Sequence, residues 1–284
     1  MNKKEMLIVV SILFIVLITI LVLIPNNENK KEDNDDYPFK IHFFDVGKAD
    51  SMIISYDNTY TLIDTAEEKD SSKIIEYLIK NNINKIDYLI LTHFDKDHVG
   101  GASNIIDNFE VEHIYISNYP KDSEYYNKYI DSVNKKDIRT EMVTGNNIID
   151  IIDKTDYKMY INGPSKVFDK DSSNNSSLIV GIKYKDNSFL FMGDAQNDRI
   201  EEYIELDDNE YDFIKMPYHG NHLKRNKELI NKYNFQYAVI TSSDQKPEDD
   251  RTIELLNDYR IDYYLTRNGS IDVYSNGKNI KIVQ

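Results

Sequence analysis

Cysteine is absent from this sequence of 284 residues, and its absence excludes several kinds of site. A chain without cysteine has no disulfide bridges, thiolate metal ligands or cysteine nucleophiles, so His, Asp or Glu must bind any metal ion. The sequence also lacks a Gly-x-Ser-x-Gly segment. Acyl transfer by a serine nucleophile is therefore without support.

Positive charge is scarce as well. The chain has 34 Lys and Arg residues against 49 Asp and Glu residues, a net charge of −15, and residues 37–284 alone carry −13. A surface with this balance repels polyanions and anionic lipid headgroups at long range. Binding of nucleic acid is possible, but the charge disfavours it.

The residues that are abundant support a folded protein. Hydrophobic residues make up 40% of the sequence and aromatic residues 12%, with 22 Tyr and 11 Phe. This composition is sufficient for a buried core and excludes wholesale disorder. The length fits one large α/β domain with an appendage, and no linker or fixed repeat interrupts residues 37–284.

The appendage is an apolar N-terminal segment. Residues 6–24 contain nothing more polar than Ser and Thr, and a helix of this length crosses a hydrocarbon layer of about 30 Å. Lys3 and Lys4 precede it, which favours a cytoplasmic N-terminus. We therefore expect residues 1–25 to be a tail and single-pass membrane anchor, 26–36 a flexible linker, and 37–284 an extracytoplasmic domain. A cleaved signal peptide is the alternative interpretation.

Strand and helix patterns alternate from residue 37 onward. Strands are predicted at 40–46, 51–55, 59–64, 86–91, 113–117, 139–143, 157–162, 177–184, 189–192, 213–216, 237–241, 263–266, 270–274 and 280–283. Helices are predicted at 69–81, 122–135, 197–205, 224–233 and 251–259. This mixed order indicates an α/β fold in which two sheets are covered by helices.

Four potential metal ligands follow the apolar run 86–91. Residues 91–101 read Leu-Thr-His-Phe-Asp-Lys-Asp-His-Val-Gly-Gly and include His93, Asp95, Asp97 and His98. On a helix these side chains would point around the whole circumference, whereas a loop at the end of a strand lets them converge. Imidazole with carboxylate suits Zn²⁺, Mn²⁺ or Fe²⁺. An acidic surface loop is the alternative, but it does not explain the buried strand or the two glycines.

Two further candidates lie at predicted strand ends. Asp194 follows 189–192 and His219 follows 213–216. An Asp after Gly is often a turn or helix cap, and a lone His is often structural. If both are ligands, six donors exceed what one tetrahedral ion accepts, so two divalent ions sharing a carboxylate are expected.

Six short segments, taken in their order along the chain, resemble the motifs of a known family. They are Asp-Val-Gly-Lys-Ala-Asp at 45–50, Leu-Ile-Asp-Thr at 62–65, Thr-His-x-Asp-x-Asp-His-x-Gly-Gly at 92–101, Asn-Asn-Ser-Ser at 174–177, Gly-Asp-Ala at 193–195 and Lys-Met-Pro-Tyr-His-Gly at 215–220. Together they resemble the metallo-β-lactamase superfamily. Asp95 stands where a second His is more common, a variant similar to the β-lactamase-like domain of competence DNA-uptake channel proteins (ComEC). Tyr218 and Asn221 depart from the last motif.

The resemblance implies an αββα sandwich with a dinuclear site of Zn²⁺ or Mn²⁺. It implies that Asp194 bridges the two ions, which activate a bridging hydroxide. The remaining donors divide into a first-ion set, His93 and Asp95, and a second-ion set, Asp97, His98 and His219. Asp97 is also expected to be catalytic.

Supporting roles are predicted for five more residues. Asp45 and Asp64 are candidates to orient a metal-bound imidazole, although each also suits an ordinary turn. Asn174 and Ser177 either contact substrate or support their loop. His222 is a candidate proton donor to the leaving group, with a surface histidine as the alternative.

Three functions remain open. The favoured one is an anchored extracytoplasmic metallohydrolase that cleaves a small or surface-polymer phosphodiester. The second is a ComEC-like nuclease assisting DNA uptake, which a local basic groove around Lys215, Lys224, Arg225 and Lys227 would favour. The third is a catalytically weak, metal-binding interaction module.

Overall fold

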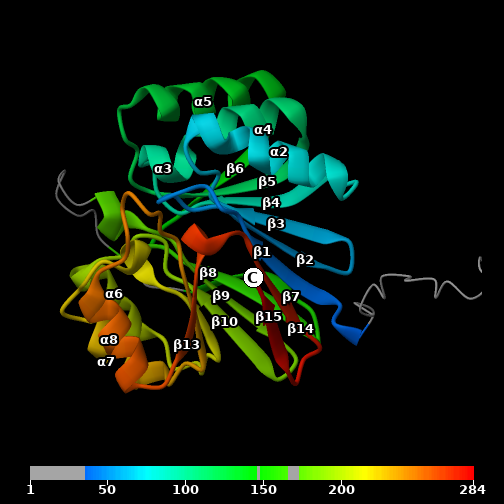
Figure 1. Cartoon of the computed structure of the whole chain (residues 1–284). Coiled ribbons are helices and arrows are strands. Elements are labelled where there is room, and N and C mark those ends of the chain that lie inside the picture. The colour runs from blue at the N-terminus through cyan, green and yellow to red at the C-terminus, as the bar shows by residue number, and fades with distance from the viewer. Residues whose placement is uncertain (1–35, 146–147, 166–172) are drawn as a thin grey trace, which may run out of the picture. The chain divides into compact units, whose positions relative to one another are not determined.

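The computed structural model describes residues 36–145, 148–165 and 173–284, and two β-sheets dominate this part of the chain (Figure 1). The first sheet has the strand order β15-β14-β1-β2-β3-β4-β5-β6. Its strands are β1 (Phe39–Phe43), β2 (Met52–Tyr56), β3 (Thr59–Ile63), β4 (Lys85–Leu91), β5 (Glu110–Ser117), β6 (Arg139–Val143), β14 (Ile271–Ser275) and β15 (Ile280–Val283). Pairing is antiparallel from β15 to β3 and parallel from β3 to β6.

The second sheet has the order β13-β12-β11-β10-β9-β8-β7. Its strands are β7 (Ile148–Asp153), β8 (Tyr157–Asn162), β9 (Ile179–Tyr184), β10 (Asn187–Phe191), β11 (Phe213–Lys215), β12 (Tyr237–Ile240) and β13 (Asp262–Leu265). The strands from β10 to β13 are parallel, and those from β7 to β10 are antiparallel.

Helices cover the outer face of each sheet (Figure 1). The first sheet is covered by α2 (Ser71–Lys80), α3 (Lys96–Val99), α4 (Ala102–Asn108) and α5 (Glu124–Lys136). The second is covered by α6 (Asn197–Leu206), α7 (Asn226–Tyr233) and α8 (Asp250–Asp258). The predicted arrangement of two sheets between helical layers is confirmed for residues 37–284, which form one compact unit.

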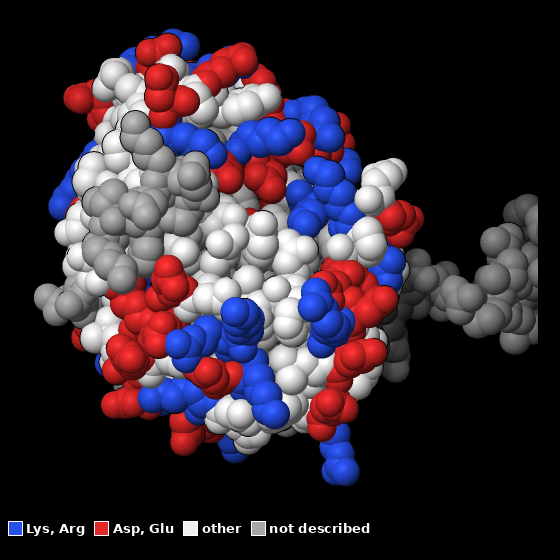
Figure 2. Space-filling model, turned by 90° about the vertical axis from the view of Figure 1, so that its left-hand side faces the viewer, with Lys and Arg blue, Asp and Glu red and all other residues white. Residues whose placement is uncertain are grey.

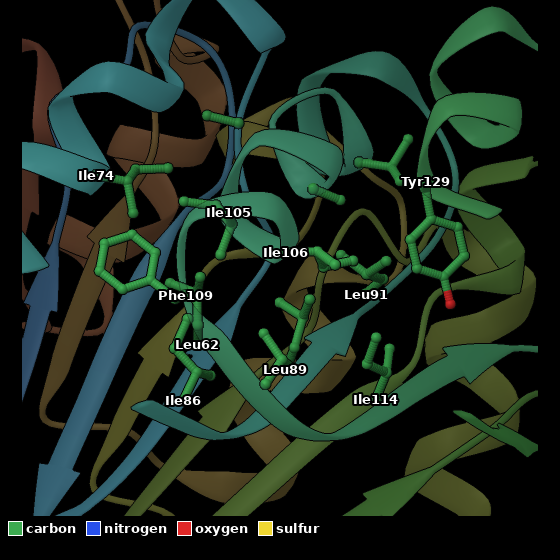
Figure 3. Packing of buried hydrophobic residues seen from close by; sticks show 14 of the residues in the cluster. Leu62, Ile74, Ile86, Leu89, Leu91, Ile105, Ile106, Phe109, Ile114 and Tyr129 are labelled. Atoms are coloured by element: carbon green, nitrogen blue, oxygen red, sulfur yellow. The ribbon is translucent and has the colours of Figure 1, made fainter. Parts of the chain in front are cut away.

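Side chains on alternate positions of the strands pack into separate hydrophobic cores, one between the sheets and others beneath the helices. On β1, Phe39 and Phe43 point between the sheets, where Phe39 stacks on Phe189 with ring centroids 5.0 Å apart. On β4, Ile90 joins that inter-sheet core, whereas Leu89 and Leu91 face the helices, because successive side chains point to opposite faces of a strand. Figure 3 shows Leu89 and Leu91 packed beneath the helical layer with Ile74, Ile105, Ile106 and Tyr129.

The parallel strands position the candidate site. The chain leaves β3 and β4 at one edge of the first sheet, and it leaves β10, β11 and β12 at one edge of the second. Loops after the carboxyl ends of neighbouring parallel strands lie next to each other. Residues distant in sequence are thereby brought to the same edge of the sandwich.

Some predicted elements differ from the structure. The pattern of the sequence does not indicate α4 or β7, and it predicts a loop throughout residues 92–99. Lys96–Val99 instead forms the short helix α3, so Asp97 and His98 lie on a helical turn, whereas His93 and Asp95 precede it, Asp95 in an extended conformation. Gly100 permits this turn, because a Cβ there would lie 2.3 Å from the Lys96 carbonyl and 2.7 Å from the Glu68 backbone nitrogen.

The predicted N-terminal span, residues 6–24, lies outside the described residues. Within the part of the chain that the structure describes, none of the helices is both long enough and apolar enough to cross a membrane.

Candidate metal centre

Buried polar side chains converge where both sheets end. Asp64 directly follows β3, His93 follows β4, and Asp194 follows β10. His219 lies in η4 (Pro217–Gly220) after β11, and Thr241 directly follows β12. All five are at most 3% exposed, so the sequence places polar groups in the interior at the edge where strand ends meet.

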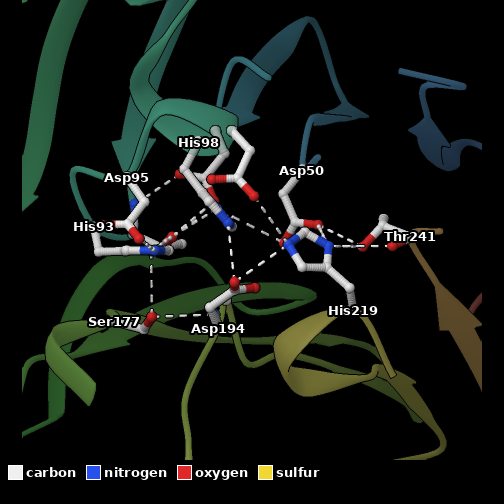
Figure 4. A network of polar contacts seen from close by, with 12 residues as sticks. Asp50, His93, Asp95, His98, Ser177, Asp194, His219 and Thr241 are labelled. Carbon is white, nitrogen blue, oxygen red and sulfur yellow. Dashed lines mark hydrogen bonds and ion pairs between the residues drawn. The ribbon is translucent and has the colours of Figure 1, made fainter. Parts of the chain in front are cut away.

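Four of the predicted ligands form a tight cluster (Figure 4). The ligand atoms of Asp97, His98, Asp194 and His219 all lie within 4.8 Å of one another. Asp194 Oδ2 lies 3.4 Å from His98 Nε2 and 3.2 Å from His219 Nε2. Asp97 Oδ2 lies 3.4 Å from His219 Nε2. The structure therefore brings together the residues predicted for the second ion with the predicted bridging carboxylate.

Hydrogen bonds fix the tautomers of His98 and His219. His98 Nδ1 lies 2.8 Å from Asp64 Oδ2, and His219 Nδ1 lies 3.1 Å from the Thr241 carbonyl oxygen. Both oxygens can only accept, so each Nδ1 carries a proton and donates it. Each Nε2 therefore faces the cluster and is the atom that the neutral imidazole offers to a metal ion. Asp64 thus lies where a residue orienting an imidazole was predicted.

The same argument applies to His93. Thr92 Oγ1 donates its only proton to Asp64 Oδ2 at 2.7 Å, so it can only accept from His93 Nδ1 at 3.2 Å. Thr92 also donates its backbone N–H to Asp64 Oδ1 at 2.8 Å. One carboxylate therefore organises two histidines, because Asp64 holds His98 directly and His93 through Thr92.

The donor set fits a divalent transition metal. Nε2 of His93, His98 and His219 and Oδ1 of Asp194 are buried and make no hydrogen bond. Buried polar atoms without partners are uncommon in folded proteins, and four in one cluster call for a ligand that accepts lone pairs. Imidazole nitrogen with carboxylate oxygen suits Zn²⁺ or Mn²⁺.

The electrostatics of the cluster agree with cation binding. Burial lowers the pKa of His93, and the neighbouring His98 lowers it further. Although burial opposes protonation of His219, Asp194 and Asp50 raise its pKa to about 9. Asp194 and Asp64 likewise raise the pKa of His98 above its usual range. Imidazole binds a metal only as the neutral base, so a cation entering this cluster must displace these protons.

The carboxylates respond in the opposite direction. Burial would raise the pKa of Asp194, but the adjacent His219 and His98 hold it well below its usual range. For Asp97, burial is again outweighed by the same two imidazoles, which lower its pKa. Both side chains are therefore ionised at neutral pH and available as anionic ligands.

Asp50 and Lys215 belong to the site, although no role was predicted for Asp50 and Lys215 was predicted only as part of a possible basic groove. The Lys215 ammonium forms an ion pair with Asp50, donates to the Gly193 carbonyl oxygen at 3.0 Å, and lies 3.8 Å from Asp194 Oδ1. Asp50 Oδ1 also accepts from Thr241 Oγ1 at 2.5 Å. Asp50 and Lys215 are both fully buried. They form a buried ion pair next to Asp194, and Asp50 Oδ1 also lies 3.4 Å from His219 Nδ1.

Asp95 lies at the solvent-facing side of the cluster. Its Oδ2 is 4.0 Å from His93 Nε2, while its Oδ1 accepts from Lys121 Nζ at 2.6 Å and from Ser173 Oγ at 2.7 Å. The predicted first-ion pair, His93 and Asp95, is thus brought together. Neither Lys121 nor Ser173 was predicted, because each lies on an unremarkable polar segment of the sequence.

The Asn-Asn-Ser-Ser segment supports the cluster from the second sheet. It overlaps η3 (Ser173–Ser176) and ends one residue beyond it. Ser177 is fully buried, and its Oγ accepts the backbone N–H of Asp194 at 3.1 Å. The Asn174 carbonyl accepts the Ser177 N–H at 3.1 Å, and Asn175 Oδ1 accepts the Gln196 N–H at 3.0 Å. These contacts are those of loop support, the second of the two predicted roles.

Asp45 and His222 lie apart from the cluster. The Asp45 carbonyl accepts from Lys73 Nζ at 2.8 Å, and the residue lines a surface recess that also includes His42. His222 is exposed and lies near Asp249, whose pKa is lowered to about 2, chiefly by its hydrogen bonds with Arg251. In the part of the chain that is described, no contact joins either residue to the cluster.

The backbone around the site is unusual. Asp64, Tyr218 and His219 have φ values of 55°, 50° and 52°, in the left-handed region that residues other than Gly rarely adopt. Such strain is concentrated at functional sites. Tyr218 directly precedes His219 and is half-buried, and its pKa is raised by burial and then by Asp194 and Asp97.

Comparison with known proteins agrees with this geometry. A model of the metallo-beta-lactamase superfamily matches residues 44–240, which contain every member of the cluster. ComE operon protein 3 from Bacillus subtilis (strain 168) is 24% identical over 226 residues, or 72% of this chain. The match covers 28% of that protein, so this chain corresponds to only part of its length.

Solved structures share the fold at low sequence identity. The metallo-beta-lactamase fold protein YhfI from Bacillus subtilis has a TM-score of 0.54 and 8% identity, covering 86% of this chain and 100% of its own. Zn²⁺-bound PqqB from Methylobacterium extorquens has a TM-score of 0.51 and 11% identity, covering 76% of this chain and 85% of its own. Igni18, a metallo hydrolase from Ignicoccus hospitalis KIN4/I, has a TM-score of 0.50 and 11% identity, covering 86% and 99%.

Proposed function

The chain belongs to the metallo-beta-lactamase superfamily, and from that premise we propose that it is a metal-dependent hydrolase of phosphodiesters. The observation that carries the proposal is the cluster of Asp97, His98, Asp194 and His219, with unpartnered donor atoms on three of its members. With His93 and Asp95 beside it, the site offers three imidazoles and three carboxylates. We infer that these six residues hold two divalent ions, Zn²⁺ or Mn²⁺.

Ions bound there would supply Lewis acidity toward a phosphoryl oxygen and would make water a nucleophile near neutral pH. The protein contributes preorganisation, because Asp64 and Thr241 hold His98 and His219 in fixed orientations. Asp97 is 26% exposed and is the member of the four-residue group that faces solvent. Since it is ionised at neutral pH, we assign it the role of accepting a hydrogen bond or proton from substrate or water.

The composition of the donor set favours phosphodiesters over β-lactams. Three carboxylates, those of Asp95, Asp97 and Asp194, place more negative charge around the ions than a site rich in histidine would. This charge weakens Lewis acidity toward a neutral amide carbonyl. A phosphodiester has two non-bridging oxygens on which charge accumulates as the nucleophile attacks, and paired ions stabilise that charge.

We expect the purified protein, supplied with Mn²⁺ or Zn²⁺, to hydrolyse bis-(p-nitrophenyl) phosphate and to leave penicillin essentially intact. Chelation should abolish the reaction, because the bound ions would supply both the Lewis acidity and the activated water. Release of p-nitrophenolate and loss of β-lactam absorbance measure the two rates. His113→Ala, on β5 outside the cluster, is a control that should retain activity.

Two outcomes would count against this proposal. Faster hydrolysis of penicillin than of the phosphodiester would reverse the assigned selectivity. Metal binding with no turnover of any phosphodiester would leave the metal-binding interaction module as the function.

A nuclease is a second candidate, favoured by the similarity to ComE operon protein 3. The basic groove that would support a nuclease loses two of its four predicted cations. Lys215 is fully buried, and Arg225 forms ion pairs with Glu201 and Glu228. Figure 2 views the side on which α3 and α6 lie in Figure 1, where groups of Lys and Arg are separated by Asp and Glu around an uncharged zone. Single-stranded and duplex DNA belong in the same substrate panel, and cleavage faster than that of small phosphodiesters would favour the nuclease.

We further propose that residues 6–24 anchor the protein in the cell membrane, with the hydrolase unit outside. The apolar length of the segment and the preceding Lys3 and Lys4 support this orientation. The protein should remain in the membrane fraction, and protease added to intact cells should digest residues 37–284. Recovery of the full-length chain from the soluble cytoplasmic fraction would contradict the anchor.

A further inference from the structure

The carboxylate of Asp95 already has a cation. Lys121 Nζ donates to Asp95 Oδ1 at 2.6 Å, and Ser173 Oγ donates to the same oxygen at 2.7 Å. Only Oδ2 faces His93, at 4.0 Å from its Nε2. Among the six predicted ligands, Asp95 is the one whose side chain is bound by the ammonium group of a partly exposed lysine.

The two halves of the site differ in how completely they are formed. Asp97, His98, Asp194 and His219 lie with their ligand atoms mutually within 4.8 Å, and this group does not include His93 or Asp95. Three of its four members are at most 4% exposed in their side chains. The Asp95 side chain is 26% exposed. Burial does not separate the two halves, because the Asp97 side chain is also 26% exposed and His93 is fully buried. They differ because one half has four ligand atoms close together, whereas in the other the carboxylate is already bound by a side-chain cation.

We propose that Lys121 is an internal counter-cation that competes with a metal ion for Asp95. The chain then binds one divalent ion tightly at the Asp97, His98, Asp194 and His219 group and a second ion weakly at His93 and Asp95. This inference rests on the proposed metal-dependent function. It adds a positioning role for Lys121 and an order in which the two positions fill.

Charge explains why this lysine matters. An Asp at position 95 adds a negative charge that the more common His would not bring, and the Lys121 ammonium neutralises it. A dication approaching Asp95 meets that ammonium at close range, and either the two cations repel each other or the lysine leaves. Binding at this position therefore includes the free energy of breaking an ion pair, which weakens the apparent affinity.

Lys215 provides a contrast within the same site. It is fully buried against Asp50 and the Gly193 carbonyl, so it cannot move into solvent without breaking the interior. Lys121 lies in the segment between β5 and α5, and its side chain is 39% exposed. Its ammonium can therefore turn into water when an ion takes Asp95. Lys215 is a fixed charge, and Lys121 is an exchangeable one.

The test is a calorimetric titration of metal-free protein with Mn²⁺, without substrate, checked by elemental analysis after desalting. Wild-type protein should show one tight and one weak site. Lys121→Met should tighten the weak site by roughly fivefold, the upper value for one partly exposed ion pair, and should change the tight site by less than about twofold. Lys121→Arg keeps the ion pair and should retain the weak site.

Two matched variants separate this effect from a general change of charge or loop structure. Lys128→Met removes the same charge from α5, where Lys128 pairs with Glu68 and Glu124, and should leave both affinities unchanged. Ser173→Ala removes a neutral donor from Asp95 and should tighten the weak site less than Lys121→Met does. Neither control touches a residue of the four-membered group.

The result that overturns the inference is a second site whose affinity is unchanged or weaker in Lys121→Met. Equal affinities at both positions in the wild type would overturn it as well. Failure of the proposed function gives different results: either neither wild type nor Lys121→Met binds Mn²⁺ or Zn²⁺, or the metals bind with the two affinities expected here and no phosphodiester is hydrolysed.

Discussion

Asp194→Ala should empty both metal positions and lower phosphodiesterase activity by at least about a hundredfold, the scale expected when a transition-state electrostatic element is lost. Asp194 is the proposed bridging ligand, and its Oδ2 lies 3.4 Å from His98 Nε2 and 3.2 Å from His219 Nε2. Removing it takes a shared anionic ligand from both ions. It also leaves the two imidazoles facing each other without the carboxylate that balances them.

Elemental analysis and the rate of p-nitrophenolate release measure the two effects. Asp208→Ala is the matched control, because Asp208 is exposed and pairs only with Lys232 at the surface. That control should retain both metals and full activity. If Asp194→Ala kept two bound ions, the assignment of Asp194 as the bridging ligand would be wrong.

Lys215→Met should lower the free energy of unfolding by about 3–5 kcal/mol, the cost of leaving one charge of a buried ion pair without its partner. Lys215 and Asp50 are both fully buried, so after the substitution Asp50 keeps its charge in the interior without its ammonium partner, with the Thr241 hydroxyl as a donor and His219 Nδ1 at 3.4 Å. Urea denaturation of the metal-free protein measures the change. Metal-free conditions remove the contribution that bound ions make to stability.

Two further variants sharpen this measurement. Adding Asp50→Asn to Lys215→Met should recover part of the lost stability, because the uncompensated charge is then gone. Lys232→Met breaks an exposed pair with Asp208 and should cost less than about 1 kcal/mol. If Lys215→Met lowered the free energy of unfolding by as little as that, Asp50 and Lys215 would not form the stabilising buried ion pair described above.

Periodicity and turn residues predicted most strands, since alternation on β1 and the apolar run of β4 are local properties of the sequence. The superfamily predicted from the ordered short segments is confirmed. The helix α3 was not predicted, because a loop seemed necessary for four ligands to converge. The structure meets that requirement differently, with His93 and Asp95 before the helix and Asp97 and His98 on its first turn.

The supporting residues could not be read from local pattern. The segment 45–50 offers an Asp at each end, and nothing in its spacing distinguishes them; Asp45 was predicted and Asp50 contacts the site. Lys121 reaches Asp95 from 26 residues away and Ser173 from 78. Such pairs are set by how the sheets pack, so they become visible only in three dimensions.

The contact between Asp50 and Thr241 has a consequence for the order of folding. The hydrogen bond joins residues 191 positions apart, and β1 pairs with β14 near the other end of the domain. Contacts between such distant positions incur loop-closure entropy before they stabilise the fold, so they form late. A nascent chain that has not yet emerged beyond β12 lacks the residues that fix His219. Metal capture at the preorganised group therefore belongs to the last stage of folding and follows synthesis of nearly the whole domain.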